Sequence, residues 1–196
     1  MNERGTLFVV SAPSGAGKNA ILRPILQNDP SLSYSISATT RQPRQGEVDG
    51  QDYFFLDQAE FCRRIEQGEF AEWAEVHGHL YGTLRSVLTE EMASGKDVIL
   101  ELDVLGMRNL KGILPDAVTI FIAPPSLEEL ERRLRNRGTE NDATIQLRLK
   151  NAEMEMAALD EYDYVVVNDD VQAAISQVEK IIAEERRPRL SQESQH

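Results

Sequence analysis

The sequence predicts an α/β protein built around a parallel sheet, and three observations support this fold class. Short apolar segments of strand length alternate with longer segments that have helical spacing. The first apolar segment runs directly into the glycine-rich stretch SAPSGAGKN at residues 11–19. Polar side chains follow two further apolar segments, as ELD at 101–103 and VND at 167–169. Because ligands of parallel sheets bind beyond the carboxyl ends of the strands, these features predict one ligand-binding edge.

Length, charge and cysteine content limit the classes of function. The 196 residues suffice for one globular domain with lobes. A net charge of −12 argues against a general nucleic-acid binder, which needs a basic face to neutralise phosphates. The single cysteine, Cys62, excludes an internal disulfide and a cysteine-based metal site. The N-terminal apolar run is too short for a signal peptide, and no segment approaches about 18 apolar residues. We therefore expect no membrane association and a cytoplasmic location.

The first elements in chain order are a buried strand over 6–10, a glycine-rich turn and a helix over 18–28 that contains Pro24. This order is the context of a phosphate-binding loop. The spacing of Ala12, Gly17 and Lys18 nearly satisfies G-x-x-x-x-G-K-[ST]. Asn19 stands where a Ser or Thr hydroxyl would meet Mg²⁺, so the stretch is either a working loop with an altered metal contact or the relic of one.

The segment from about 34 to 90 is richer in Ser, Thr and Gly. We expect short strands at 34–37 and 52–56, a helix from the capping residue Asp57, and a second helix over 83–95. Arg41 and Arg44 stand three apart beside Glu47, around a stiffening proline. Two arginines so close repel each other unless an acid or an anion neutralises them, which indicates either phosphate binding or a solvated pair.

The second half of the chain continues the alternation. We expect strands over 97–104, 117–125 and 162–170, and helices over 126–138, 141–159 and 171–185. Ser126 and Glu129 have the spacing of a capping box. The last residues, 186–196, lack apolar periodicity, and we expect a disordered tail there.

Two groups of charged residues in this half are candidates for chemistry. Glu101 and Asp103 lie on one face of a strand end, which suits a metal–water shell, contacts to the donors of a base, or a cap of the following loop. Arginines gather at positions 133, 135, 137 and 148, either as a helix face paired with nearby glutamates or as an anion-binding group.

The chain resembles the guanylate kinase family. The motifs that carry the resemblance are SISATTRQPRQGEVDGQDYFF, GEFAEWAEVHGHLYGT, LELDVLG, FIAPPSLEELERRLRNRGT and EYDYVVVNDD, and it covers about residues 5–185 without a gap. It implies a three-layer P-loop fold with a CORE (1–34, 95–125 and 162–185), a GMP-binding lobe (35–94) and a helical LID (126–161). It also implies Mg²⁺-dependent transfer of the γ-phosphoryl group of ATP to GMP, giving ADP and GDP.

The resemblance further implies a role for individual residues of this chain. The catalytic residues would be Lys18, Arg41, Arg44, Arg137 and Arg148. The ATP-binding residues would be Ser14, Gly15, Ala16, Gly17, Lys18, Asn19 and Asn168, with Asn19 meeting the metal directly or through water. The GMP-binding residues would be Ser37, Arg41, Arg44, Glu47, Tyr53, Glu72, Tyr81, Thr83, Glu101 and Asp103.

Two other functions remain open at this point. Guanylate-kinase-like modules in scaffold proteins bind phosphorylated peptides without catalysis, and Asn19 is the feature that favours this alternative. A kinase for another phosphorylated acceptor would not need the guanine-contacting side chains that the resemblance places at Ser37, Glu72 and Thr83. We expect ATP and GMP as partners and no nucleic acid, and the sequence does not distinguish a monomer from a homo-oligomer.

Overall fold

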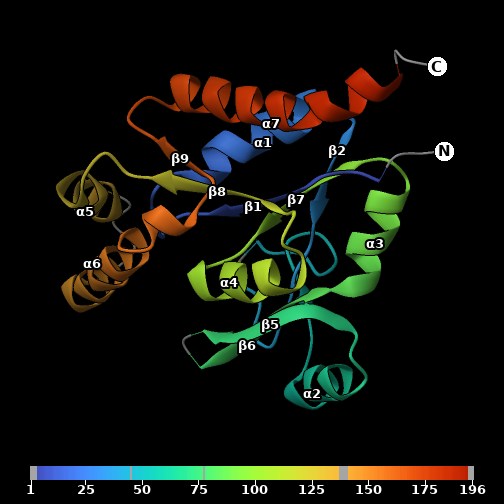
Figure 1. Cartoon of the computed structure of the whole chain (residues 1–196). Coiled ribbons are helices and arrows are strands. Elements are labelled where there is room, and N and C mark those ends of the chain that lie inside the picture. The colour runs from blue at the N-terminus through green and yellow to red at the C-terminus, as the bar shows by residue number, and fades with distance from the viewer. Residues whose placement is uncertain (1–3, 45, 77, 137–140, 194–196) are drawn as a thin grey trace. The chain divides into compact units, whose positions relative to one another are not determined.

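The computed structural model describes residues 4–44, 46–76, 78–136 and 141–193, and has the predicted mixed α/β architecture (Figure 1). The larger sheet has the strand order β2-β7-β1-β8-β9, in which the pairs β2–β7 and β8–β9 are parallel. A second sheet has the order β4-β3-β6-β5. The strands are β1 (Leu7–Ser11), β2 (Leu32–Ser35), β3 (Ala38–Thr39), β4 (Phe54–Phe55), β5 (Phe70–Val76), β6 (His79–Leu84), β7 (Asp97–Glu101), β8 (Val118–Ala123) and β9 (Tyr164–Val167).

The helices match most of the segments with helical spacing. They are α1 (Lys18–Asn28), α2 (Gln58–Glu66), α3 (Arg85–Ala93), α4 (Val104–Ile113), α5 (Leu127–Asn136), α6 (Asp142–Met156) and α7 (Val171–Glu193), with a 3₁₀ turn η1 (Leu159–Glu161). None of the described helices is long and apolar enough to cross a lipid bilayer.

The chain divides into two compact units, each made from two separate stretches of sequence. Unit 1 comprises Met1–Val9 and Ser31–Ala117, and unit 2 comprises Val10–Pro30 and Val118–His196. Strand β1 therefore contributes its first residues to unit 1 and its last two to unit 2.

The small sheet of unit 1 contains an antiparallel hairpin, β5–β6, that the sequence did not predict. Its register places Glu72 opposite Thr83, after a β-bulge between Phe70 and Glu72. The ring of Phe70 stacks on that of Phe61 from α2, with the ring centroids 4.4 Å apart. A Cβ atom at Gly82 would lie 2.8 Å from the Phe70 ring, so a glycine on β6 makes room for this core. The buried stack fixes the hairpin against α2.

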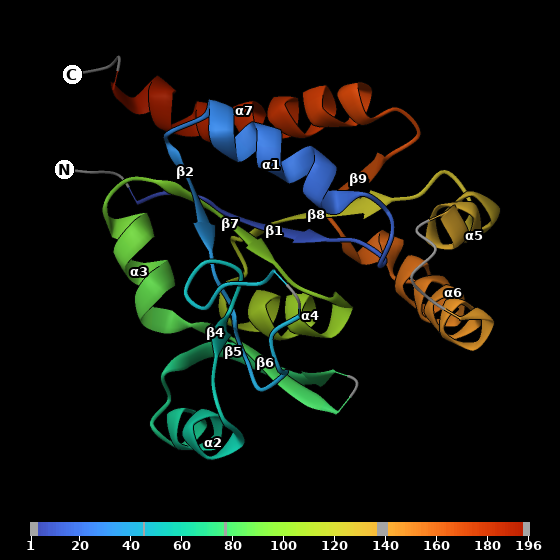
Figure 2. The ribbon, with the colours of Figure 1, turned by 180° about the vertical axis from the view of Figure 1, so that it is seen from behind.

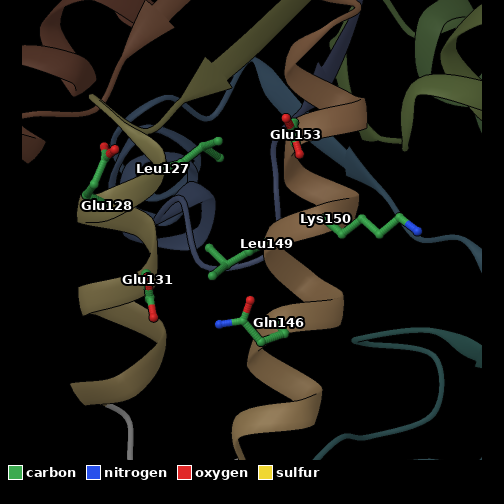
Figure 3. A pocket seen from close by; sticks show the side chains of 7 residues that line it. All are labelled: Leu127, Glu128, Glu131, Gln146, Leu149, Lys150 and Glu153. Carbon is green, nitrogen blue, oxygen red and sulfur yellow. The ribbon is translucent and has the colours of Figure 1, made fainter.

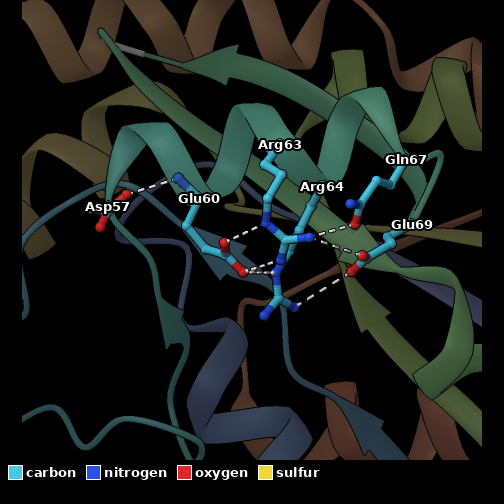
Figure 4. Close-up of polar contacts among 6 residues, drawn as sticks. All are labelled: Asp57, Glu60, Arg63, Arg64, Gln67 and Glu69. Carbon is cyan, nitrogen blue, oxygen red and sulfur yellow. Dashed lines mark hydrogen bonds and ion pairs between the residues drawn. The ribbon is translucent and has the colours of Figure 1, made fainter.

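Polar contacts hold α2 at both of its ends (Figure 4). The predicted cap is confirmed, since the Asp57 carboxylate accepts a 2.7 Å hydrogen bond from the backbone N–H of Glu60. The Glu60 carboxylate in turn accepts from Arg63 and Arg64, each at 2.7 Å. Both arginines also lie within 4 Å of Glu69, just before β5. These pairs are largely exposed, so they orient α2 more than they stabilise it.

In unit 2, α1 and α7 lie side by side, as both ribbon views show (Figure 2). Helices α5 and α6 pack around buried Leu130, Leu134 and Ile145, and the labelled residues of Figure 3 show that the two helices run antiparallel. At one end of this pair, Leu127 and Leu149 point toward each other from the two helices (Figure 3). They line a cavity of about 270 Å³ together with polar residues of both helices.

Helix α7 is longer than predicted, and this corrects the expected bounds of the C-terminal tail. It continues from Val171 to Glu193, so the residues from 186 to Glu193 are helical rather than a disordered tail. The Arg186 guanidinium lies 2.7 Å from an Asp29 carboxylate oxygen, which ties this part of the helix to the end of α1.

Candidate functional site

The phosphate loop lies in unit 2, where β1 ends and α1 begins. Gly15 and Gly17 have φ angles of 99° and 89°, a left-handed conformation that favours glycine. Helix α1 begins at Lys18, and its N-cap residue, Gly17, makes no side-chain capping hydrogen bond. Such a helix terminus, preceded by a glycine-rich turn, binds anions through backbone N–H groups and the helix dipole.

A buried asparagine supports the loop from the end of β9. The Asn168 amide donates a 2.6 Å hydrogen bond from Nδ2 to the carbonyl oxygen of Ala16, and Asn168 is only 1 % exposed. A Cβ atom at Gly17 would lie 2.5 Å from Asn168 Nδ2, so this packing requires a glycine there. Within the described part of the chain, Asn168 Oδ1 is buried and has no hydrogen-bond partner, which leaves an acceptor beside the loop.

Arginines of α5 and α6 approach the same loop. The Arg148 guanidinium donates a 3.0 Å hydrogen bond to the Ser14 hydroxyl. Arg133 pairs with Glu129 at 2.8 Å and donates to the Asn168 carbonyl oxygen at 3.0 Å. Arg135 pairs with Glu131 at 2.8 Å, so the charged helix face considered from the sequence is present on α5. Arg137 lies outside the described residues.

The most buried charged group among the predicted site residues is Glu72, in unit 1. It is 5 % exposed, and its Oε1 accepts a 2.6 Å hydrogen bond from the Thr83 hydroxyl across the β5–β6 hairpin. Burial raises the pKa of Glu72 from 4.5 to about 7; the Thr83 hydrogen bond opposes this rise, and the nearby carboxylate of Asp103 adds to it. A carboxyl group with a pKa near 7 can accept hydrogen bonds from a ligand through both oxygens once it has released its proton.

Asp103 faces the same point as Glu72. It caps α4, where its Oδ1 accepts a 2.7 Å hydrogen bond from the Gly106 backbone N–H. A Cβ atom at Gly106 would lie 3.2 Å from Asp103 Oδ1 and 3.3 Å from Glu72 Oε2. The two carboxylates therefore converge on the first turn of α4.

A second cluster in unit 1 surrounds the guanidinium group of Arg41. Glu47 binds it through two hydrogen bonds of 2.9 and 3.0 Å, and also accepts a 2.7 Å bond from the Arg44 backbone N–H. This ion pair lowers the pKa of Glu47 and raises that of Arg41. The Arg41 guanidinium lies 5.3 Å from the centre of the Tyr53 ring, which meets the Tyr81 ring edge-on at 6.1 Å. Glu47 thus neutralises Arg41, whereas it contacts Arg44 only through the backbone N–H, and the Arg44 side chain is exposed.

The remaining predicted residues of unit 1 lie on its strands or next to them. Glu101 ends β7 and stands near Tyr34 of β2, whose pKa is raised by burial and by this carboxylate. The Ser37 backbone carbonyl accepts a 2.9 Å hydrogen bond from the Phe54 N–H, which joins the strand β3 region to β4.

Sequence reasoning missed helix α4, and with it Gly106. The segment 97–104 was predicted as one strand, but β7 ends at Glu101 and Asp103 begins a helix. The helix start had a visible signal, since an Asp followed by apolar residues at helical spacing, Val104, Met107 and Leu110, is typical of an N-cap. The sequence placed Glu101 and Asp103 on one strand face, whereas they belong to different elements.

The candidate site contains few side chains that could bind a metal ion. Among the residues that the structure describes, no group of three His, Cys, Asp or Glu side chains could hold an ion. Asn19 is exposed in the first turn of α1, beside the phosphate loop. An amide oxygen is a hard donor of the kind that Mg²⁺ accepts, so this donor set fits an ion held mainly by nucleotide phosphates and water.

The family model, the relatives and the solved structure described below are all guanylate kinases. A family model described as guanylate kinase matches residues 4–185. Guanylate kinases of Thermotoga maritima and Aromatoleum aromaticum are 46 % and 47 % identical, over 93 % and 98 % of this chain and 88 % and 93 % of those proteins. A crystal structure of guanylate kinase from Anaplasma phagocytophilum is similar with a TM-score of 0.76 and 35 % identity, covering 94 % of this chain and 87 % of the other.

Proposed function

The chain belongs to the guanylate kinase family, and on that premise we propose how its residues divide the work of an ATP:GMP phosphotransferase. The protein transfers the γ-phosphoryl group of ATP to GMP and releases ADP and GDP. None of the relatives described above favours the non-catalytic binding module considered from the sequence. The proposed GMP-binding residues belong to unit 1, and the proposed ATP-binding residues to unit 2.

The buried pair of Glu72 and Thr83 carries the assignment of guanine as the base. Guanine presents two adjacent donors, N1–H and the 2-amino group, whereas adenine has an unprotonated N1 and no 2-amino group. A buried carboxylate with its Oε2 free of the Thr83 bond accepts from such donors and would be left unpaired by adenine. Asp103 supplies a second acceptor beside Glu72, while Ser37 and Glu101 complete the proposed acceptor site.

The phosphate of GMP is proposed to bind at the Arg41 cluster. Arg41 and Arg44 would grip its oxygens, and the Tyr53 and Tyr81 hydroxyls would donate to it. Glu47 neutralises Arg41 in the free protein and keeps its guanidinium in place. The attacking oxygen of GMP already carries negative charge, so the transfer needs no strong general base, only neutralisation of charge on the moving phosphoryl group.

The proposed ATP site uses the phosphate loop of unit 2. The backbone N–H groups of residues 14–19 would surround the phosphates, with Lys18 neutralising their charge. Asn168, which holds the loop through the Ala16 carbonyl oxygen, is proposed to lie near the adenine of ATP. Arg148, which already reaches Ser14, is proposed to contact the transferred group together with Arg137.

Kinases of this kind use a divalent metal with ATP, and we propose Mg²⁺. Asn19 would hold it, directly or through a water molecule, and the ion would neutralise charge on the phosphate oxygens. We retain the CORE, GMP-binding lobe and LID divisions, and the cytoplasmic location, as parts of this proposal.

Coupled measurement of ADP release tests the proposal. With ATP and Mg²⁺, we expect turnover with GMP and little with AMP. Glu72→Gln should lower kcat/KM for GMP at least tenfold by replacing one acceptor oxygen with a donor. Glu75→Gln, at an exposed position on the same strand, is the matched control and should leave it within twofold. Equal rates with AMP and GMP would contradict the assignment of guanine.

A further inference from the structure

We propose that Gly106 is a specificity-determining residue: the absence of a side chain there lets the carboxylates of Glu72 and Asp103 converge on the first turn of α4. This inference rests on the proposed function, because it concerns how the same site distinguishes guanine from related bases. Gly106 itself need not touch the nucleotide. It acts as a positioning residue, through the space that it leaves to two acceptors.

Backbone conformation does not explain a glycine at this position. Gly106 lies within α4 and is not among the residues with positive φ. A glycine in a helix costs stability relative to alanine, because it loses more conformational freedom on folding. Its backbone N–H cap bond to Asp103 would be available to any residue except proline. The explanation must therefore come from the surroundings of its Cα.

Those surroundings leave little room for a methyl group. A Cβ atom would meet Asp103 Oδ1 at 3.2 Å, Glu72 Oε2 at 3.3 Å and the Leu102 Cβ at 3.3 Å. Contacts this short require the neighbours to move by a few tenths of an ångström. Hydrogen bonds hold both carboxylates in place, because Glu72 accepts from the Thr83 hydroxyl and Asp103 accepts from the backbone N–H of Gly106 itself. A methyl group would thus displace acceptors that the fold otherwise fixes.

Displacement of the two carboxylates should weaken recognition of guanine more than recognition of hypoxanthine. Both bases have N1–H, but only guanine has the 2-amino group, and it therefore needs two acceptors placed together. IMP, which carries hypoxanthine, can satisfy its single donor with a carboxylate that has shifted. Gly106 should therefore set the ratio of kcat/KM values for GMP and IMP.

Helix α4 supplies its own control. Gly112 lies in the same helix, and a Cβ atom there would meet no atom within 4 Å. Gly106→Ala and Gly112→Ala make the same chemical change with the same gain in helix propensity, but only the first presses on the two carboxylates. We would measure kcat/KM for GMP and IMP, KM for ATP, and the thermal midpoint of the full-length protein.

We expect Gly106→Ala to lower kcat/KM for GMP by about tenfold and to narrow the GMP/IMP ratio at least threefold, with KM for ATP within twofold of the parent. Gly112→Ala should match the parent in all kinetic constants. In a Glu72→Gln background, Gly106→Ala should lower kcat/KM for GMP by a smaller factor than in the parent, because one of the two acceptors that it displaces is already altered.

Three results would overturn the inference. They are an unchanged GMP/IMP ratio in Gly106→Ala, a loss shared equally by GMP, IMP and ATP, and a thermal midpoint far below that of the parent, which would mean that the methyl group disturbs the fold rather than the acceptors. Failure of the proposed function would look different, because the parent protein itself would then not prefer GMP.

Discussion

The affinity for GMP should depend steeply on pH near neutrality because of Glu72. Burial raises the pKa of this carboxyl group from 4.5 to about 7 in the free protein. In its ionised form neither carboxylate oxygen carries a proton, so Glu72 can accept hydrogen bonds from guanine while Oε1 keeps its bond from the Thr83 hydroxyl. Bound guanine donors stabilise the charged form, so GMP binding near pH 7 should release a proton from Glu72.

The size of the effect follows from the titration curve. With a pKa of about 7, the ionised fraction of Glu72 falls from about nine-tenths at pH 8 to about one-tenth at pH 6. The dissociation constant for GMP should therefore rise about tenfold over this range. An ordinary glutamate with a pKa near 4.3 would be almost fully ionised throughout and would produce almost no change.

Isothermal calorimetry of GMP binding between pH 6 and 8, in buffers of different ionisation enthalpy, measures both the affinity and the protons released. The phosphate of GMP also titrates near pH 6 and contributes its own, smaller slope. Glu72→Gln separates the two, because it removes the carboxyl group and leaves the phosphate. Glu75→Gln should behave as the parent.

The argument predicts about half a proton released per GMP bound at pH 7 by the parent, beyond the amount in Glu72→Gln. An identical pH slope in both proteins would refute it, since the titration would then belong to the phosphate alone. A parent affinity that rises as the pH falls would refute it more strongly, because it would mean that the protonated group binds guanine.

Three further predictions concern stability and the phosphate loop. Because the pKa of Glu72 is raised, the folded protein holds a proton that the unfolded chain has lost, and stability therefore falls as the pH rises from about 4.5 to 7. In the absence of nucleotide, Glu72→Gln should raise the free energy of unfolding at pH 8 by up to about 3 kcal/mol and leave it unchanged near pH 4. Urea titrations at the two pH values measure this difference. Gly17→Ala should raise KM for ATP at least tenfold, because the new Cβ atom would lie 2.5 Å from Asn168 Nδ2. Gly78→Ala is the control, since Gly78 has a similar positive φ but open surroundings, and it should lower only the thermal midpoint. Asn168→Ala should lower the free energy of unfolding by about 1–3 kcal/mol, because it leaves the Ala16 carbonyl unpaired. It should also raise KM for ATP but not for GMP, and equal changes in both constants would contradict its proposed role in ATP binding.

The parts of the site that depend on local spacing were predictable. The phosphate loop is one continuous stretch after one strand, so its glycines, Lys18 and the start of α1 followed from the sequence. The Asp57 cap of α2 is local in the same way. Asn168 could be assigned to the ATP site only through the family resemblance, because its contact with Ala16 joins residues 152 positions apart.

The parts that depend on register were not predictable from spacing. Glu72 meets Thr83 only because β5 and β6 form a hairpin, and glycines at 78 and 82 weaken the alternating pattern that would have indicated it. Gly106 appears in the sequence as one glycine within an apolar stretch. Its significance comes from the two carboxylates that converge on it, and one of these lies 34 residues earlier in the chain.

The division of the chain into two units has a consequence for its synthesis on the ribosome. Unit 1, with the proposed GMP site, is complete in sequence once Ala117 has been added. The phosphate loop is translated early, but its unit also requires residues 118–196, including Asn168. At about 5–20 residues per second, translation of residues 118–196 takes on the order of ten seconds after Ala117 has been added. The residues of the proposed acceptor site are therefore all translated before those of the proposed ATP site are complete.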